Sequence, residues 1–170
     1  MENNQKTAEM LENLLEENKM LKNENKILKA ELKGKNKKIK YLSYHDELTG
    51  LYNRKFVYEE IDRLKKSGSF PISVIIASLN KLKMINETHG HTQGDKYIKK
   101  AADLLKNNFN QGVILARIAG DELAVILKKT EQEHANRIAD EINNSFEQAN
   151  ENNNEKFPLS ISLGTSTMDA

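Results

Sequence analysis

The pattern of apolar residues changes abruptly near Tyr44 and divides the chain into two parts. Before this residue, leucines recur at heptad spacing in a stretch rich in lysine, glutamate and asparagine, with a single glycine and no proline. After it come runs of β-branched residues, glycine turns and both prolines of the chain. The pattern therefore predicts an extended helical segment over residues 1–44 and a folded domain over residues 45–170.

The first segment has the heptad pattern of a coiled coil. Position d is leucine with one lysine exception, in the set Leu14, Leu21, Leu28, Lys35 and Leu42. Position a mixes apolar residues with asparagine, in the set Leu11, Asn18, Asn25, Leu32 and Ile39. Leucine at d with asparagine at a favours two parallel strands in a fixed register, so we expect a homodimer. A single amphipathic helix packed on the domain is the alternative, although such helices usually carry a wider apolar stripe.

The second segment alternates between helix and strand patterns. Helices are expected at Lys55–Lys66, with Asn53 as the N-cap, at Asp95–Asn108 and at Glu131–Ala149. Strands are expected at Ile72–Ala77, Val113–Ile118, Leu123–Leu127 and Leu159–Ser166, and a polar loop at Asn150–Glu155. The short connection Ala119–Glu122 between two strands is a hairpin signal. Interleaved helices and strands that include a hairpin predict an α/β (α+β) fold with a mixed sheet.

Composition and charge exclude several classes of function. The 26 basic and 25 acidic residues leave no basic excess of the kind that binds nucleic acid. The absence of cysteine excludes disulfides, zinc–thiolate sites and thiol nucleophiles. Because neither a secretory signal nor an apolar run of about 18 residues is present, we expect a cytoplasmic protein without a membrane span. The five lysines of Lys33–Lys40 are interpreted as a solvated helix face, with anionic lipid as the alternative contact.

The hairpin turn carries the first residues that suggest chemistry. Asp121 and Glu122 are adjacent carboxylates, and Gly120 before them lets a ligand approach the backbone closely. Acidic residues at a sheet edge can hold Mg²⁺ against triphosphate oxygens. A Gly-Asp pair is also an ordinary hairpin turn, so the turn by itself leaves both interpretations open.

Five ordered blocks of the second segment resemble the motifs of GGDEF domains. His45–Arg54 is similar to D-x-L-T-G-L-x-N-R, and Ser78–His91 to D-x-D-x-F-K-x-I-N-D-x-x-G-H. Gly94-Asp95 matches the G-D that follows, Arg117–Leu123 resembles R-x-G-G-D-E-F, and Ser160–Gly164 is similar to S-I-S-x-G. The resemblance implies a nucleotidyl-cyclase fold like the polymerase palm, with a mainly antiparallel sheet flanked by helices. Active members condense two GTP into cyclic di-GMP between two facing subunits, and a coiled coil would raise their effective concentration.

The resemblance also implies roles for individual residues. Asp121 and Glu122 match the catalytic acids, and the metal positions are Asp121, Ser78 and the backbone of Leu79. The nucleotide-binding positions are Leu82, Lys83, Asn86, Asp95 and Gly120. An aspartate suits guanine because it accepts from the N1–H and the amino group together. Mg²⁺ or Mn²⁺ is expected only with bound nucleotide. Helix capping by Asn86 and Asp95 is the alternative, and His89 and His91 are interpreted as structural.

Several positions depart from the family pattern. Ser78 and Asn80 stand where the family has the two aspartates of D-x-D, and Ala119 replaces the first glycine of the signature. Loss of a residue that only supports a metal ligand typically lowers metal affinity or activity ~10–100-fold, so loss of a carboxylate that binds the metal directly should lower them at least as much. Asn110 and Val113 stand where many cyclases have the R-x-x-D site that binds product. The further helix and strand that carry phosphate-contacting basic residues in the family have no counterpart in this sequence, so we expect part of the phosphate clamp to be lacking.

These departures predict a degenerate GGDEF protein of cyclic di-GMP signalling. We expect a dimeric regulatory, interaction or GTP-binding module with little or no turnover, and a protein partner that the sequence does not identify. The alternative is an active diguanylate cyclase that condenses two GTP with Mg²⁺, using Asp121, Glu122 and the Ser78 hydroxyl.

Overall fold

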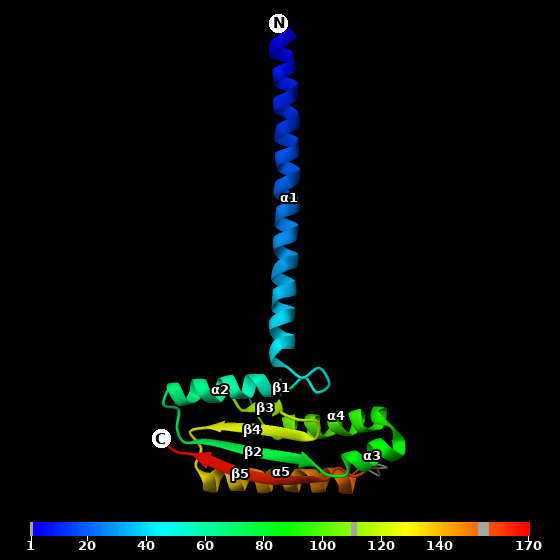
Figure 1. Cartoon of the computed structure of the whole chain (residues 1–170), viewed down its shortest axis with the longest axis vertical. Coiled ribbons are helices and arrows are strands. Elements are labelled where there is room, and N and C mark those ends of the chain that lie inside the picture. Colours follow the sequence, from blue (N-terminus) through cyan, green and yellow to red (C-terminus); the bar gives the residue numbers. More distant parts are fainter. Residues whose placement is uncertain (1, 110–111, 153–156) are drawn as a thin grey trace. The chain divides into compact units, whose positions relative to one another are not determined.

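The computed structural model describes residues 2–109, 112–152 and 157–170. The chain divides into two units, Met1–Tyr41 and Leu42–Ala170, which are described separately (Figure 1). The first unit is formed by helix α1 (Glu2–Tyr44), whose last residues reach into the second unit. None of the described helices is long and apolar enough to cross a bilayer.

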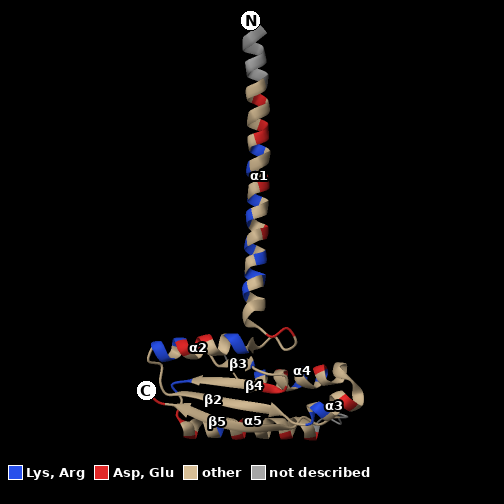
Figure 2. Cartoon of the chain, viewed as in Figure 1, with Lys and Arg blue, Asp and Glu red and all other residues tan. Residues whose placement is uncertain are grey.

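Helix α1 is continuous from Glu2 to Tyr44 and includes every predicted heptad position. Gly34 does not interrupt it, and blue lysines gather in its C-terminal half (Figure 2). The apolar heptad residues are about half to two-thirds exposed in the single chain, as measured for Leu11, Leu14, Leu21, Leu28, Leu32 and Ile39. A row of leucines in water is a typical contact surface for another helix. The predicted helix is confirmed, and its pairing with a second copy stays a prediction.

A five-stranded sheet forms the centre of the second unit. Its strands are β1 (Tyr52–Asn53), β2 (Ile72–Leu79), β3 (Ile114–Arg117), β4 (Glu122–Lys128) and β5 (Ile161–Met168). They lie in the order β1-β3-β4-β2-β5; the β1–β3 pair is parallel and the other pairs are antiparallel. The predicted mixed, mainly antiparallel sheet is confirmed, whereas the short β1 was not predicted.

Helices cover both faces of this sheet (Figure 1). They are α2 (Arg54–Lys66), α3 (Leu82–His89), α4 (His91–Asn107) and α5 (Gln132–Asn152). Helix α2 buries Val57 on one face, while α4 and α5 bury Leu105 and Ile142 on the other. Along β4, Val125 and Ile126 belong to opposite faces, as the two-residue period of a strand requires. The domain therefore has two apolar layers, one on each side of the sheet.

The structure confirms one predicted helix start and corrects another. Asn53 caps α2, since its side chain accepts a hydrogen bond from the Phe56 N–H. Helix α4 begins at His91 rather than at Asp95, and Gly90 is its N-cap residue. Asp95 lies inside α4 and Asn86 inside α3, so the alternative in which these two residues cap helices is wrong.

Other element ends differ from the predicted ones by a few residues. Helix α3 was not predicted, because its eight residues are too short for a clear apolar period. Helix α5 runs on to Asn152, so the first residues of the predicted loop Asn150–Glu155 are helical, and residues 153–156 lie outside the described part. Strand β2 continues two residues beyond Ala77, which brings Ser78 and Leu79 into the sheet.

Candidate functional site

The sheet brings the predicted metal and catalytic positions together at the end of β2. Ser78 lies opposite Glu122 of β4 on one side and opposite Ser162 of β5 on the other. The Leu79 N–H donates to the carbonyl oxygen of Asp121 at 2.8 Å, which holds the hairpin turn beside the end of β2. The two carboxylates of the turn therefore stand next to a serine, and Asp121 is exposed while Glu122 is half-buried.

Arg117, at the end of β3, fastens the hairpin turn. Its guanidinium donates to the Gly120 carbonyl oxygen at 2.8 Å and forms an ion pair with Asp46 at 3.2 Å. Asp46 also accepts hydrogen bonds from the N–H and the hydroxyl of Thr49. Partial burial acts to raise the pKa of Asp46, but the Thr49 hydrogen bonds and the Arg117 charge outweigh it and lower the pKa below its ordinary value. The turn is thus anchored to the loop that precedes β1.

Asn80, in the second D-x-D position, forms hydrogen bonds in a polar cluster between β2, α4 and β5. Its side-chain nitrogen donates to the Ser160 hydroxyl at 3.0 Å, and its side-chain oxygen accepts from the Ser162 hydroxyl at 3.1 Å. The Tyr97 hydroxyl donates to the Asn80 carbonyl oxygen at 3.1 Å. The Asn80 amide is thus both a donor and an acceptor here, whereas a carboxylate in its place could only accept hydrogen bonds from the two serine hydroxyls.

A pocket of about 330 Å³ opens beside the hairpin turn. It is lined by residues of α3, the start of α4 and the turn, namely Leu82, Lys83, Asn86, Glu87, His91, Gly120 and Asp121. Its volume lies at the small end of the range for ligand sites. The first three of these residues, with Gly120 and Asp121, were predicted from the sequence as nucleotide or catalytic residues. The predicted site residues Ser78, Leu79, Asp95 and Glu122 are not among the residues that line it.

Glu87 and His91 are pocket residues without a predicted binding role: Glu87 was not assigned, and His91 was interpreted as structural. The signal that could have found them is their helical spacing from residues that were assigned, because Glu87 follows Lys83 by one turn. Lys83 Nζ and Glu87 Oε1 are 3.9 Å apart, and both side chains are largely exposed. An exposed pair of this kind contributes about 0–1 kcal/mol, so an anionic ligand can replace Glu87 as the partner of Lys83 at little cost.

The residues at the turn offer few ligands to a divalent cation. Within the described residues, no group of three or more His, Cys, Asp or Glu side chains could hold a metal ion. Asp121 and Glu122 supply carboxylates, and Ser78 adds a neutral hydroxyl. Mg²⁺ is commonly bound by one or two carboxylates together with substrate phosphates, which is the role that this set could fill.

The two histidines of the H-x-H sequence have separate surroundings. The His89 ring lies edge-on to Phe157 with centroids 4.7 Å apart, and its Nδ1 is 2.6 Å from the Thr88 hydroxyl. His91 lines the pocket instead. Of the two positions that correspond to the family's product-binding R-x-x-D, Asn110 lies outside the described residues, and Val113 is half-buried against the core.

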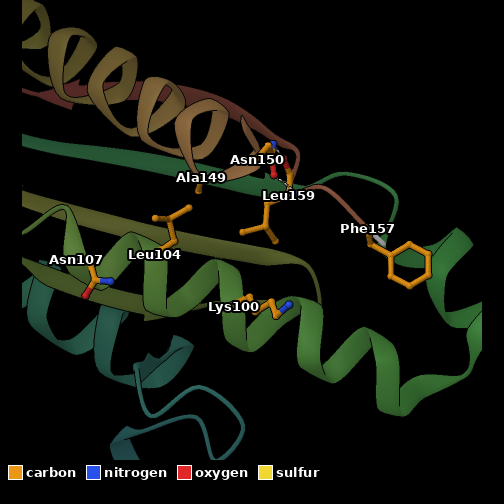
Figure 3. Close-up of a pocket in the computed structure, with 7 residues that line it drawn as sticks. All are labelled: Lys100, Leu104, Asn107, Ala149, Asn150, Phe157 and Leu159. Atoms are coloured by element: carbon orange, nitrogen blue, oxygen red, sulfur yellow. Dashed lines mark hydrogen bonds between the residues drawn. The ribbon is translucent and has the colours of Figure 1, made fainter. Parts of the chain in front are cut away.

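A second pocket, of about 230 Å³, lies between α4 and α5 (Figure 3). Its wall is formed by Leu104, Ala149 and Leu159, and Asn150 holds the Leu159 backbone through hydrogen bonds of 2.7 and 2.8 Å. None of the residues that were assigned chemistry from the sequence lines this pocket. Of these two pockets, the one beside the hairpin turn therefore contains the assigned residues that line a pocket, and Asp95 lines neither.

The sheet order, the helices on both faces and the acidic hairpin beside a pocket define a nucleotidyl-cyclase-like α/β domain. The family described as "Diguanylate cyclase, GGDEF domain" matches residues 43–170. The chain therefore belongs to the GGDEF family.

Two curated relatives carry diguanylate cyclase names. The probable diguanylate cyclase DgcT of Escherichia coli is 30% identical over 129 residues, covering 74% of this chain and 28% of DgcT. Diguanylate cyclase DosC of Escherichia coli is 32% identical over 125 residues, covering 70% of this chain and 27% of DosC. The chain thus spans less than a third of the length of either relative.

Solved structures share the fold. The coiled coil and GGDEF domain of DgcB from Caulobacter crescentus, in complex with c-di-GMP, has a TM-score of 0.75 at 21% identity, covering 86% of this chain and 80% of DgcB. Diguanylate cyclase SiaD from Pseudomonas aeruginosa, in complex with its activator SiaC, has a TM-score of 0.65 at 20% identity, covering 98% of this chain and 66% of SiaD.

Proposed function

We propose that this protein is a degenerate GGDEF protein of cyclic di-GMP signalling, a dimeric regulatory or GTP-binding module with little or no turnover. The observation that carries the proposal is the neutral end of β2. Ser78 faces Glu122 there, and the Asn80 side chain is engaged with Ser160 and Ser162. Phosphoryl transfer depends on cations that neutralise developing charge, and β2 supplies no carboxylate to hold them.

The pocket supports nucleotide binding without turnover. It combines a cation at Lys83, an amide at Asn86 and an apolar wall at Leu82. A purine base needs an apolar surface and a few directed polar groups, and its phosphates need a cation. Asp95 is exposed in α4, one helical turn after the pocket residue His91. A ligand that extends out of the pocket past His91 would come within reach of Asp95. Mg²⁺ or Mn²⁺ would enter with the phosphates and lie against Asp121.

The exposed leucines of α1 support a parallel homodimer. Leu14, Leu21 and Leu28 are each at least 50% exposed in the single chain, which is costly for a row of leucines unless another helix covers it. A second copy of the same helix offers the matching seam. We propose a protein partner as well, because one structural neighbour, SiaD, is in complex with its activator. The proposed location is the cytoplasm.

The test is incubation of the concentrated protein with GTP and Mg²⁺ or Mn²⁺, followed by chromatography of the products. We expect no cyclic di-GMP from the native protein, and micromolar binding of GTP in a parallel titration. Sustained synthesis by the native protein would falsify the proposal. A Ser78→Asp variant measured in parallel tests whether the missing carboxylate causes the lack of synthesis. Product from this variant alone would locate the defect at Ser78.

An active diguanylate cyclase is the second candidate, favoured by the presence of both Asp121 and Glu122 at the turn. In this case the Ser78 hydroxyl, water and substrate oxygens would complete the coordination of Mg²⁺. It predicts synthesis by the native protein that disappears in Asp121→Asn. Equal product from both proteins would mean that a contaminant makes it.

A further inference from the structure

Gly94 of α4 lies directly against the side chain of Asn86 in α3. A Cβ placed on Gly94 would overlap Asn86 Oδ1 and would lie 2.9 Å from Cγ and 3.3 Å from Nδ2. These three nearest atoms all belong to the Asn86 carboxamide. Gly94 is buried, and it stands within a regular helix, where glycine is normally a poor residue. The space that its missing side chain leaves is therefore filled by Asn86.

The same contact buries one atom of the Asn86 carboxamide. Oδ1 is shielded from solvent and has no hydrogen-bond partner within the described residues. Buried acceptors without a donor are rare in native proteins and need a reason, because they lose their bonds to water. Asn86 also lines the pocket beside Asp121. The carboxamide nitrogen, by contrast, is not among the buried atoms that lack a partner in the described part of the chain.

We propose that Gly94 is a positioning residue for the nucleotide site, a role that rests on the proposed GTP binding. Because Gly94 has no side chain, the Asn86 oxygen fits between α3 and α4. This position of the oxygen directs the Asn86 N–H₂ toward the ligand. A primary amide nitrogen only donates hydrogen bonds, so it pairs with a ring nitrogen or carbonyl oxygen of a base. A purine that places a carbonyl oxygen opposite the Asn86 N–H₂ accepts a hydrogen bond from it. A purine with an amino group at that position puts two donors opposite each other and binds more weakly.

The first experiment measures the Kd of GTP and of ATP, each with Mg²⁺, by calorimetry. Gly94→Ala is compared with the native protein, with Asn86→Ala and with the double variant. Gly34→Ala is the matched control, since Gly34 is also helical and a Cβ there meets nothing within 4 Å. We expect Gly94→Ala to weaken GTP binding at least tenfold and to reduce the preference for GTP over ATP. In the Asn86→Ala background the same change should have no further effect.

Native affinity and native preference in Gly94→Ala would overturn the proposal. An equal loss of affinity with and without Asn86 would also overturn it, because the effect would then not pass through this side chain. A lower GTP-to-ATP preference is the result that a merely structural glycine would not produce.

The second experiment measures Tm without nucleotide for the native protein, Gly94→Ala, Asn86→Ala and the double variant. Alanine is a better helix former than glycine, so Gly94→Ala should raise Tm when Asn86 is already alanine. It should raise Tm less, or lower it, when Asn86 is present. Identical Tm changes in the two backgrounds would mean that the two residues are not coupled, and the positioning role would be rejected. Because no ligand is involved, this result stands even if the native protein binds neither nucleotide and the proposed function fails.

Discussion

The Arg117 guanidinium lies 3.2 Å from the Asp46 carboxylate, although the two residues are 71 positions apart in the chain. The same guanidinium donates to the Gly120 carbonyl oxygen in the acidic turn. Both charged side chains are largely buried, with exposed fractions of 15% and 23%. The pair therefore joins the loop before β1 to the turn that carries Asp121 and Glu122.

Replacing one member of this pair should destabilise the domain. In Asp46→Asn the carboxylate that accepts from Arg117 and Thr49 becomes a neutral amide, so charge-assisted hydrogen bonds are lost. We expect the free energy of unfolding to fall by about 1–3 kcal/mol. Urea unfolding followed by circular dichroism measures it. The matched control is Asp62→Asn in the exposed Asp62–Lys66 pair, where a change below about 1 kcal/mol is expected. Equal losses in both variants would contradict this ranking.

The lowered pKa of Asp46 makes stability depend on pH in a defined direction. Because the folded-state pKa lies below the unfolded one, the unfolded state binds more protons in acid, and stability rises with pH there. The contribution is fully present above about pH 5 and is lost as pH falls through the lowered pKa. Tm measured between pH 7 and pH 3 should fall less steeply in Asp46→Asn than in the native protein. Parallel curves would show that Asp46 does not contribute.

The seam of α1 should control the oligomeric state. Placing a charge at position d, as in Leu21→Asp, puts two carboxylates into the apolar seam of a parallel dimer. We expect a monomer in sedimentation velocity at concentrations where the native protein is a dimer. Asn23→Asp adds the same charge at the outward position f and should leave the dimer intact. A dimer in Leu21→Asp would locate the association elsewhere.

Restoring the family's second aspartate should weaken the fold. In Asn80→Asp the amide donor to the Ser160 hydroxyl is lost, so Ser160 has to turn its hydroxyl and donate to the new carboxylate, as Ser162 already does to the amide oxygen. A loss of about 1 kcal/mol is expected, because the half-buried position takes a charge out of water and gives it only these two hydroxyl donors. Chemical unfolding compares it with Asn144→Asp, an exposed position on α5 that should change little. Unchanged or increased stability in Asn80→Asp would mean that the polar cluster does not depend on the amide.

The sequence by itself determined the features that depend on near neighbours in the chain. The heptad spacing predicted α1, and the β-branched runs predicted β2 and the hairpin strands, since each element's period is a property of its own residues. Asn53 was recognised as a cap because its partner is three residues away. The five motif blocks likewise indicated Lys83, Asn86 and Asp121, which the structure gathers around one pocket.

The tertiary structure decided which of these side chains meet. Helix α3 packs beside α4, and this places Glu87 and His91 in the pocket while Asp95 lies outside its lining. The same packing presses Asn86 onto Gly94, and the sheet order brings Arg117 to Asp46. The contacts of Asn86 with Gly94 and of Arg117 with Asp46 do not follow from spacing along the chain, because each joins elements whose relative placement depends on how the whole core packs. A motif predicts which residues carry chemistry, and the packing of the elements decides which of them act at one site.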